Sequence, residues 1–558
     1  MKENNFEQFK KVTTEFSAES SAKKTELLKK CSLQKLPLAK QLQAYHNALL
    51  FTLAYPENKE VSFIAESELD RITLHTKKTT IAEKLAQSGI AFTPTDGAFS
   101  LTLTSWILSG FPDEVHLHSF DEGGTHPREV LKHFFPEMEF ELLSDEKLSP
   151  LKWSEKAAGT KNKNKLLKWL VDQFNSTNLP SGITEQLFEM LQLYISIKPR
   201  TKNFSRTFGR IQSAEIYYHN ELVKKFNEQK IIGKKLPKAK KLTVQEAKQI
   251  IDTSRIALAL LNRETDPVTY CNESGLTYYE LEHGISIALF SMLPPRRLPL
   301  ESYIGFMMFK NGYPMAYGGG WLFGKRSLLG INIFESFRGG ESAFVFAQLL
   351  RTYHNAFGAD YFEVEPYQFG KNNPEGIQSG AFWFYYRFGF RPVNNILNKL
   401  SEEEAVKIKE NIGYRSSFEI LKKFTACNVG LQLKSVIAPV NPAFISSYIS
   451  FRIATDFAGD REMANKKAKE FVIKKLKLQK SYVHSNKTGF GKLSLFYFLC
   501  LNESKLNQTL LKKLKLLIEL KSNDETEYCK ELSQLNINSI LSLDCLKFIS
   551  GLSAKLQV

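Results

Sequence analysis

Residues 328–343 read LLGINIFESFRGGESA, and the fold of the chain is decided around them. Residues 328–334 form a short apolar run, which is typical of a buried strand. The run ends in small and polar residues that include the adjacent glycines Gly339 and Gly340, and this composition indicates a turn. Apolar side chains then recur at spacings of three and four over residues 343–353, so we expect a helix to begin at once.

A second strand is predicted at residues 361–364, after Gly358 closes the helix. Two strands joined by one helix within about 40 residues make a crossover connection, and the strands of such a connection run parallel. The predicted unit is therefore a strand, a helix and a parallel strand.

We call residues 338–343 the glycine turn. Its backbone N–H groups lie at the start of the predicted helix beside bare glycines, and such a site can hold phosphate oxygens. Ser342 adds a hydroxyl donor. The pattern predicts a cofactor with a pyrophosphate. A glycine pair after a strand is also common in turns that bind no ligand.

Further along the chain an aromatic helix is predicted, with Ala381 and Tyr385 before Gly389 and Phe390. With this ending, residues 243–393 resemble the GNAT superfamily of N-acetyltransferases. In that family a strand leads into a glycine-containing phosphate turn, a helix, a splayed parallel strand and a helix with a tyrosine before Gly-Phe. The resemblance implies an α/β (α+β mixed) fold, in which a mixed sheet carries a crossover helix.

The resemblance also implies acetyl-CoA or another acyl-CoA as the cofactor. Arg338 and Ala343 match the two ends of the family's phosphate turn. Between them, Gly339, Gly340 and Ser342 would hold the pyrophosphate.

Glu341 departs from the family pattern, because it stands where the family has its inner glycine. A carboxylate that faced a pyrophosphate would be repelled by about 1 kcal/mol or more. Two outcomes are open. Either Glu341 turns away and Gly339 and Gly340 form the anion site, or the turn no longer binds coenzyme A.

The catalytic groups are expected at Tyr385, Glu365 and Glu363. Tyr385 matches the tyrosine that faces the coenzyme A sulfur in many members, and it would protonate the leaving thiolate with an ordinary pKa near 10. Glu365 is the first candidate for the base and Glu363 the second, because residues two apart share one side of a strand. The alternative is that both carboxylates pair with nearby cations.

Upstream of this unit the sequence predicts a helix and then an antiparallel meander. Thr243 and Glu246 form a capping box that opens the helix. Asn311 and Gly312 are a two-residue hairpin signal between the last two strands. The predicted strands are residues 277–281, 285–292, 303–309 and 314–323.

Four regions are predicted along the chain. Residues 1–150 read as a mixed α/β domain of unknown role, and residues 151–242 as a helical connector with a basic linker at 234–241. Residues 243–400 form the GNAT-like acyltransferase domain. Residues 401–558 are expected to be a basic helical C-terminal region.

The composition is that of a globular protein, since 43% of the 558 residues are hydrophobic and 24% are charged. No apolar segment reaches the roughly 18 residues of a membrane span. The start of the chain, MKENNFEQFKK, lacks the apolar core of a signal peptide, so we expect a cytoplasmic protein. Six scattered cysteines and the histidines at 116 and 118 match no zinc spacing, and no metal is predicted.

The formal net charge of +16 suits an anionic cofactor or a phosphate-rich partner, and it equally suits a solvated lysine-rich surface. Nucleic acid is therefore an open but not a favoured partner. The predicted function is transfer of an acyl group from an acyl-CoA thioester to an amine-bearing acceptor. Two alternatives stay open: a catalytically silent GNAT-like scaffold that binds nucleic acid or protein, and a transferase that uses aminoacyl-tRNA.

Overall fold

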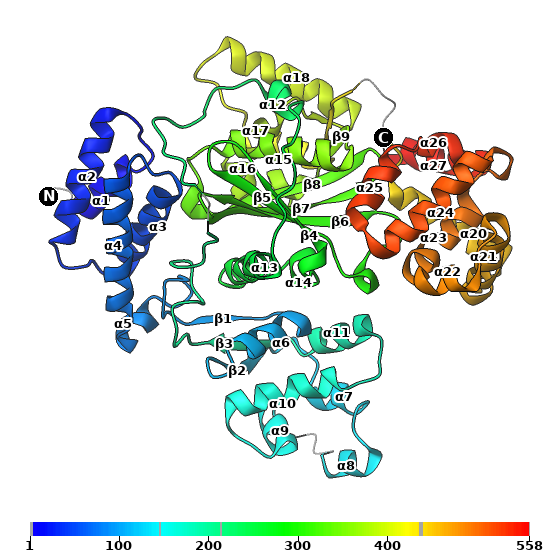
Figure 1. Cartoon of the computed structure of the whole chain (residues 1–558), viewed down its shortest axis with the longest axis horizontal. Helices are drawn as coiled ribbons and strands as arrows, with labels where there is room; N and C mark the ends of the chain where they lie inside the picture. Colours follow the sequence, from blue (N-terminus) through cyan, green and yellow to red (C-terminus); the bar gives the residue numbers. More distant parts are fainter. Residues whose placement is uncertain (1–3, 144–146, 213–214, 435–438, 557–558) are drawn as a thin grey trace.

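The computed structural model describes residues 4–143, 147–212, 215–434 and 439–556. At its centre is a mixed eight-stranded sheet with strand order β10-β11-β9-β8-β7-β6-β5-β4 (Figure 1). The chain is thus a mixed α/β protein. The strands of the central sheet are β4 (Leu276–Glu280), β5 (Ile285–Phe290), β6 (Ser302–Lys310), β7 (Tyr313–Phe323), β8 (Arg326–Ile333), β9 (Tyr361–Val364), β10 (Arg391–Pro392) and β11 (Val429–Gln432).

Strands β4 to β8 form the predicted antiparallel meander. The hairpin between β6 and β7 is confirmed: Lys310 pairs with Tyr313 across Asn311 and Gly312. Both turn residues have positive φ, 46° and 84°, as the favoured two-residue hairpin turns require. The two-residue signal therefore predicted the turn and the antiparallel pairing of the two strands.

Strands β8 and β9 run parallel, joined by α15 (Ser342–Phe357), so the predicted crossover is confirmed. Gly358 ends α15 in the left-handed conformation, with φ of 72°. The two strands pair at only three positions, and the last pair is Leu328 with Glu363. Beyond that pair, β8 continues to Ile333 without a partner from β9.

Helices cover both faces of the sheet. On one face lies α15, where Tyr353 packs so closely on Gly320 that a Cβ there would be 2.5 Å from the ring. On the other face lie α13 (Val244–Ala259) and α14 (Asp266–Thr269), and a Cβ on Gly305 would be 2.7 Å from Pro267 of α14. The capping box of Thr243 and Glu246 that starts α13 is confirmed.

The chain before the central sheet forms a helical unit and a small second sheet. The helical unit contains α1 (Asn5–Val12), α2 (Ala18–Ser32), α3 (Ala39–Ala54), α4 (Lys59–Thr76) and α5 (Thr79–Lys84). The small sheet has the strand order β1-β3-β2, and its strands are β1 (Thr95–Gly97), β2 (Val115–Phe120) and β3 (Leu193–Ile197). The helices around it are α6 (Leu101–Gly110), α7 (Pro127–Leu131), α8 (Glu137–Leu142), α9 (Pro150–Ala158), α10 (Lys163–Asn175) and α11 (Ser181–Met190).

Strand β3 lies in the segment that was predicted to be a helical connector. Helix α11 ends at Met190, and the sequence LYISI then pairs with both β1 and β2. Aromatic and β-branched residues favour a strand wherever neighbouring strands are in place, and this pairing outweighs the helical spacing. The small sheet therefore crosses the predicted boundary at residue 150.

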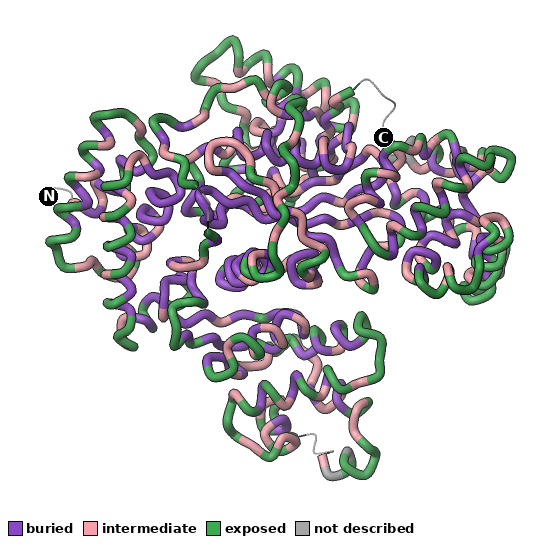
Figure 2. The backbone as a smooth tube through the Cα atoms, viewed as in Figure 1, coloured by how far each residue is buried: buried purple, intermediate pink, exposed green. Residues whose placement is uncertain are grey.

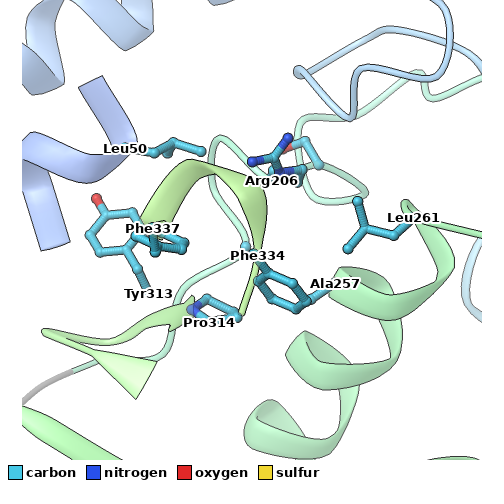
Figure 3. A pocket seen from close by; sticks show the side chains of 10 residues that line it. Leu50, Arg206, Ala257, Leu261, Tyr313, Pro314, Phe334 and Phe337 are labelled. Atoms are coloured by element: carbon cyan, nitrogen blue, oxygen red, sulfur yellow. The ribbon is translucent and has the colours of Figure 1, made fainter. Parts of the chain in front are cut away.

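A long segment, residues 198–241, leads from the small sheet to α13, and among its described residues the one helix is the short α12 (Glu228–Ile232). Near Arg206 it passes η3 (Glu335–Phe337), which directly precedes the glycine turn. There, Phe334 and Phe337 share a pocket with Leu50 of α3 (Figure 3).

The chain after the crossover is mostly helical, as predicted, but it also completes the sheet. Strand β11 inserts between β9 and β10 and is antiparallel to both. The helices that follow α15 are α16 (Pro374–Gln378), α17 (Ala381–Arg387), α18 (Asn395–Glu410), α19 (Phe418–Phe424), α20 (Pro442–Asp456), α21 (Arg461–Leu476), α22 (Lys480–Ser485), α23 (Lys487–Cys500), α24 (Gln508–Asn523), α25 (Glu525–Ser533), α26 (Ile537–Ile540) and α27 (Leu543–Leu556). Across the four described ranges, none of these or the earlier helices has the length and apolar character of a membrane span.

The C-terminal helices dock on the beginning of β6. The buried Lys521 ammonium donates to Ser302 Oγ at 3.1 Å and pairs with buried Glu525 at 3.0 Å. Arg297 donates to the Lys521 carbonyl oxygen at 2.8 Å, and Tyr528 donates to the Leu300 carbonyl oxygen at 2.8 Å. These polar groups tie α24 and α25 to the sheet.

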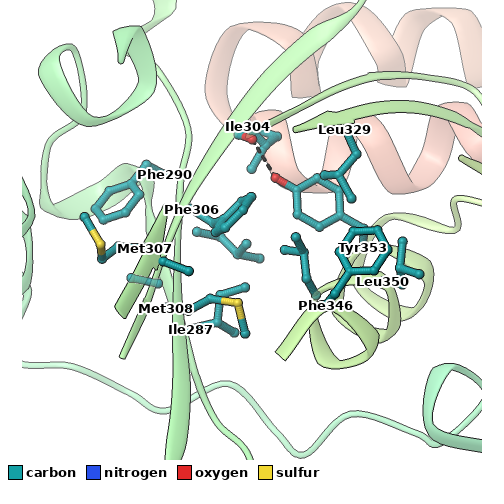
Figure 4. Packing of buried hydrophobic residues seen from close by; sticks show 14 of the residues in the cluster. Ile287, Phe290, Ile304, Phe306, Met307, Met308, Leu329, Phe346, Leu350 and Tyr353 are labelled. Carbon is teal, nitrogen blue, oxygen red and sulfur yellow. Dashed lines mark hydrogen bonds between the residues drawn. The ribbon is translucent and has the colours of Figure 1, made fainter. Parts of the chain in front are cut away.

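The core of the central unit lies between the sheet and α15. Figure 4 shows β5, β6 and β8 directing side chains toward Phe346, Leu350 and Tyr353 of α15. The Tyr353 hydroxyl donates to the Ile304 carbonyl oxygen at 2.6 Å. Figure 2 shows burial concentrated along the central strands, while the outer helices are exposed on one side. Since helices cover both faces, β6 has a continuous apolar sequence.

Candidate functional site

The candidate site lies where β8 parts from β9 and the chain turns into α15. Glu341 is the N-cap residue of α15, but its side chain does not cap the helix. Instead the carboxylate is buried, with Oε2 at 2.5 Å from Lys310 Nζ and Oε1 accepting a hydrogen bond from the Val223 N–H at 2.8 Å. Glu341 therefore turns away from the surface of the turn, which is one part of the first outcome that the sequence left open.

Lys310 supplies the opposite charge for Glu341 from the end of β6. Burial lowers the pKa of Lys310 to about 8, against the opposing influence of the Glu341 carboxylate. The ammonium also lies 4.6 Å from the centre of the Tyr55 ring. The negative charge at position 341 is therefore balanced inside the protein and is not directed at the surface of the turn.

The start of α15 has backbone N–H groups that no side chain caps. The first N–H groups of a helix have no acceptor within the helix, and here no side chain caps them. Gly339 is exposed, with φ of 89°, and Ser342 and Ala343 are half-buried. Backbone donors at an uncapped helix start, aided by the helix dipole, suit phosphate oxygens.

Two neighbours restrict the glycine turn. Arg338 is exposed and forms an ion pair with Glu375 of α16, so an anion that uses Arg338 has to compete with that carboxylate. Gly340 lies against Tyr55, because a Cβ at Gly340 would be 2.9 Å from the Tyr55 hydroxyl oxygen. The open part of the turn is thus formed by Gly339, Ser342 and Ala343.

The chain after β9 forms η4 (Pro366–Phe369), which lies beside the part of β8 that has no partner from β9. The Gln368 side chain lies over Gly330 of β8, and a Cβ on that glycine would be 3.2 Å from Gln368 Nε2. The polar amide of Gln368 therefore lines the unpaired part of β8.

The structure separates the two predicted base candidates. Glu363 is in β9, where its carboxylate pairs with Arg326 at 2.5 Å and accepts a hydrogen bond from Asn428 Nδ2 at 3.3 Å. Glu365 is exposed just after β9, and its carbonyl oxygen accepts the Gln368 N–H at 3.0 Å. Among the described residues no cation lies within ion-pair distance of Glu365.

Tyr385 is buried on α17 beside the start of α15. Its ring is 5.6 Å from that of Phe346 and 5.8 Å from that of Phe390, measured between centroids. Burial raises the pKa of Tyr385, so the expected ordinary value is wrong. The hydroxyl stays protonated at neutral pH, but it is a weaker acid than a solvated tyrosine.

The histidines of β2 lie apart from this site. His118 is exposed, with Nδ1 at 2.9 Å from Ser119 Oγ, and a bulge between Leu117 and Ser119 interrupts the alternation that would align it with His116. Among the described residues no three metal-ligating side chains form a cluster.

Sequence reasoning missed Lys310 and Val223, which hold the Glu341 carboxylate, and Tyr55, whose ring lies against the Lys310 ammonium. One signal was visible: Lys310 is a charged residue at the end of an apolar strand, directly before the hairpin pair Asn311-Gly312. A buried lysine needs a carboxylate partner. Nothing in the local pattern says which of the acidic residues of the chain supplies it.

Comparison with protein-family models, with curated proteins and with solved structures found no match to this chain.

Proposed function

We propose that the protein is an acyl-CoA-dependent N-acyltransferase, which moves an acyl group from a thioester to an amine. The observation that carries this proposal is that β8 pairs with β9 at only three positions and then continues to Ile333 without a partner from β9, close to the uncapped start of α15. The first feature suits an extended thioester arm, and the second suits the diphosphate to which that arm is attached. The sequence resemblance to the GNAT superfamily points to the same chemistry.

In this proposal the glycine turn takes the pyrophosphate of acetyl-CoA or another acyl-CoA. The N–H groups of Gly339, Ser342 and Ala343 donate to it, and the Ser342 hydroxyl adds a donor. Gly340 contributes by its lack of a side chain, since Tyr55 already fills the space beside it. Arg338 gives up its ion pair with Glu375 when the ligand binds, and its guanidinium then neutralises one phosphate charge.

The proposed chemistry places one proton acceptor and one proton donor beside the unpaired part of β8. Glu365 takes a proton from the attacking amine, since it is exposed and unpaired by any described cation, whereas Glu363 is held by Arg326. The amine nitrogen forms a bond to the thioester carbonyl carbon, the carbon–sulfur bond breaks, and Tyr385 gives its phenol proton to the departing sulfur. Glu365 then loses its proton to solvent and the Tyr385 phenolate takes one up. The raised pKa of Tyr385 keeps the phenol protonated for this step.

The experiment is a calorimetric titration of acetyl-CoA into the wild type and the Ser342→Asp variant. An aspartate in the first turn favours the helix, by about 0.3–1 kcal/mol, while it repels a pyrophosphate at the same place. We expect the variant to fold and to bind acetyl-CoA at least tenfold more weakly.

The matched control is Ser481→Asp, which makes the same change in the first turn of α22 at an exposed position. It should bind as the wild type does. Wild-type protein that does not bind acetyl-CoA, or Ser342→Asp protein that binds it equally well, contradicts the proposal. Failure of the wild type to bind, together with RNA that copurifies, would instead favour the transferase that uses aminoacyl-tRNA.

A further inference from the structure

A small pocket lies where the helical unit, the segment 198–241 and the central sheet meet. Figure 3 shows the Arg206 guanidinium on one side of this pocket and the rings of Phe334 and Phe337 beside it. About 20 Å³ is open to the centre of a water-sized sphere, and the whole space, including its mouth, is about 380 Å³. The lining residues are Leu50, Ser205, Arg206, Gly209, Ala257, Leu261, Tyr313, Pro314, Phe334 and Phe337.

Arg206 is the one charged residue in this lining. Its guanidinium donates to the Ser336 hydroxyl and, at 3.5 Å, to the Ser88 carbonyl oxygen. In the described part of the chain no carboxylate lies within ion-pair distance of it. Burial lowers the pKa of Arg206 to about 10, and the influence of Glu335 only partly opposes this.

A guanidinium in this position is poorly compensated. It has five N–H donors, and the described residues provide two neutral acceptors for them. A buried charge without a counter-ion costs free energy that a bound anion would recover.

We propose that this pocket binds the carboxylate group of a small organic acid through Arg206. The planar guanidinium matches a carboxylate with two parallel hydrogen bonds. The other walls are mostly apolar, with Leu50, Ala257 and Phe334 among them, so they suit a short hydrocarbon body.

The size and charge of the pocket limit the ligand further. A single water needs roughly 10–15 Å³ by the same measure, so the enclosed part takes a carboxylate and little more. The rest of the acid would lie toward the mouth, where Leu261 is 37% exposed. One cation neutralises one negative charge, which favours a monocarboxylate over the doubly charged phosphate.

This site does not depend on the proposed acyl transfer. Its lining residues come from segments outside the glycine turn, although Phe337 immediately precedes that turn. Loss of coenzyme A binding would leave the carboxylate pocket unaffected, and the two sites are tested by different ligands.

The test measures the melting temperature with sodium acetate or propionate, at constant ionic strength kept with sodium chloride. We expect a saturable rise for the wild type and none for Arg206→Met, which keeps much of the side-chain volume but removes the charge. Arg206→Lys keeps the charge without the planar fork and should bind at least tenfold more weakly. The matched control is Arg200→Met, an exposed arginine of the same segment, which should respond as the wild type does.

A second measurement needs no variant: saturation-transfer NMR on the full chain should show contact between the protein and the propionate methyl protons. No saturable shift and no transfer for the wild type overturns the proposal. An equal shift in Arg206→Met also overturns it. Phosphate that stabilises the wild type more than acetate, and does so through Arg206, overturns the carboxylate assignment.

Discussion

At the scale of single residues, the buried pair of Lys310 and Glu341 explains how an acidic residue can stand in the glycine turn without directing its charge at the exposed backbone N–H groups. The two side chains are fully buried and only 2.5 Å apart. Removal of one partner leaves an uncompensated buried charge, which typically costs about 3–5 kcal/mol. The pair therefore holds Glu341 in one orientation, and the start of α15 stays free of a carboxylate cap.

The pH dependence of stability tests this pair. Lys310 has a pKa of about 8 in the folded protein and 10.5 as its ordinary value, so between these values the unfolded chain binds more protons at this residue. Stability from this group therefore rises with pH above about 8. We expect the unfolding free energy of the wild type to increase, relative to a Lys310→Met/Glu341→Gln double variant, from pH 8 to about 9.5.

Two neighbours set the limits of that measurement. Burial lowers the pKa of His219, near Lys310, to about 3, so this histidine stays neutral throughout the window. Burial also raises the pKa of Tyr55, and its effect opposes that of Lys310 only near and above about pH 10. Urea unfolding at several pH values measures the difference, and a difference that is flat or falls with pH would refute the lowered pKa of Lys310 in the folded protein.

At the scale of elements, the C-terminus of α15 carries a contact that local sequence does not reveal. Gly358 has φ of 72°, and a Cβ there would be 2.3 Å from Ser533 Oγ of α25. Two requirements therefore select glycine at this position: the left-handed backbone conformation, and the lack of room for a Cβ beside α25.

Gly358→Ala should lower the unfolding free energy by about 1–3 kcal/mol, because alanine is strained at positive φ and also meets Ser533. Ser533→Gly removes the steric part and should restore some of the loss in the double variant. Chemical unfolding of the four proteins in a double-mutant cycle measures the coupling. Full additivity would show that Ser533 does not restrict the site.

Elements with strong local signals were predictable. The Asn311-Gly312 hairpin, the capping box at Thr243 and the crossover through α15 all depend on patterns within a few residues of one another. Strands β3 and β11 were missed because they are four or five residues long and are stabilised by partners far away in the sequence.

The candidate site was predictable only in part. The glycine turn was located from its own residues, but the orientation of Glu341 depends on Lys310, which lies 31 positions earlier. The burial that raises the pKa of Tyr385 depends on Phe346 and Phe390, which come from other elements. Such effects follow from tertiary packing, and a local pattern cannot supply them.

At the scale of the whole molecule, the peripheral helices are attached to the sheet by buried polar groups as well as by apolar packing. Lys521 and Glu525 are buried where α24 and α25 meet β6, and Arg297 lies 3.5 Å from the same glutamate. This junction couples the C-terminal helices to the central sheet.

Lys521→Met should lower stability by about 3 kcal/mol, because it leaves Glu525 with a weaker partner. All five tryptophans lie between residues 106 and 383, so their fluorescence reports the earlier parts of the chain, while far-UV circular dichroism also reports the C-terminal helices. If the junction couples the two parts, both signals should shift to lower denaturant concentration together.

The control for this experiment is Lys530→Met, which removes an exposed ion pair with Glu527 on the same helix α25. Exposed pairs contribute at most about 1 kcal/mol, so this variant should unfold nearly as the wild type does. A shift of the circular dichroism signal alone in Lys521→Met would mean that the C-terminal helices unfold separately.

The burial of Glu341 against Lys310 also constrains how this sequence can diverge. A glycine at position 341 would leave the buried Lys310 ammonium without a counter-ion. An apolar residue at position 310 would leave the buried Glu341 carboxylate without one. Each substitution alone is therefore costly, whereas the two together are tolerable. Homologous chains should show these two positions changing as a pair, with an uncharged residue at the end of the hairpin wherever the helix begins with glycine.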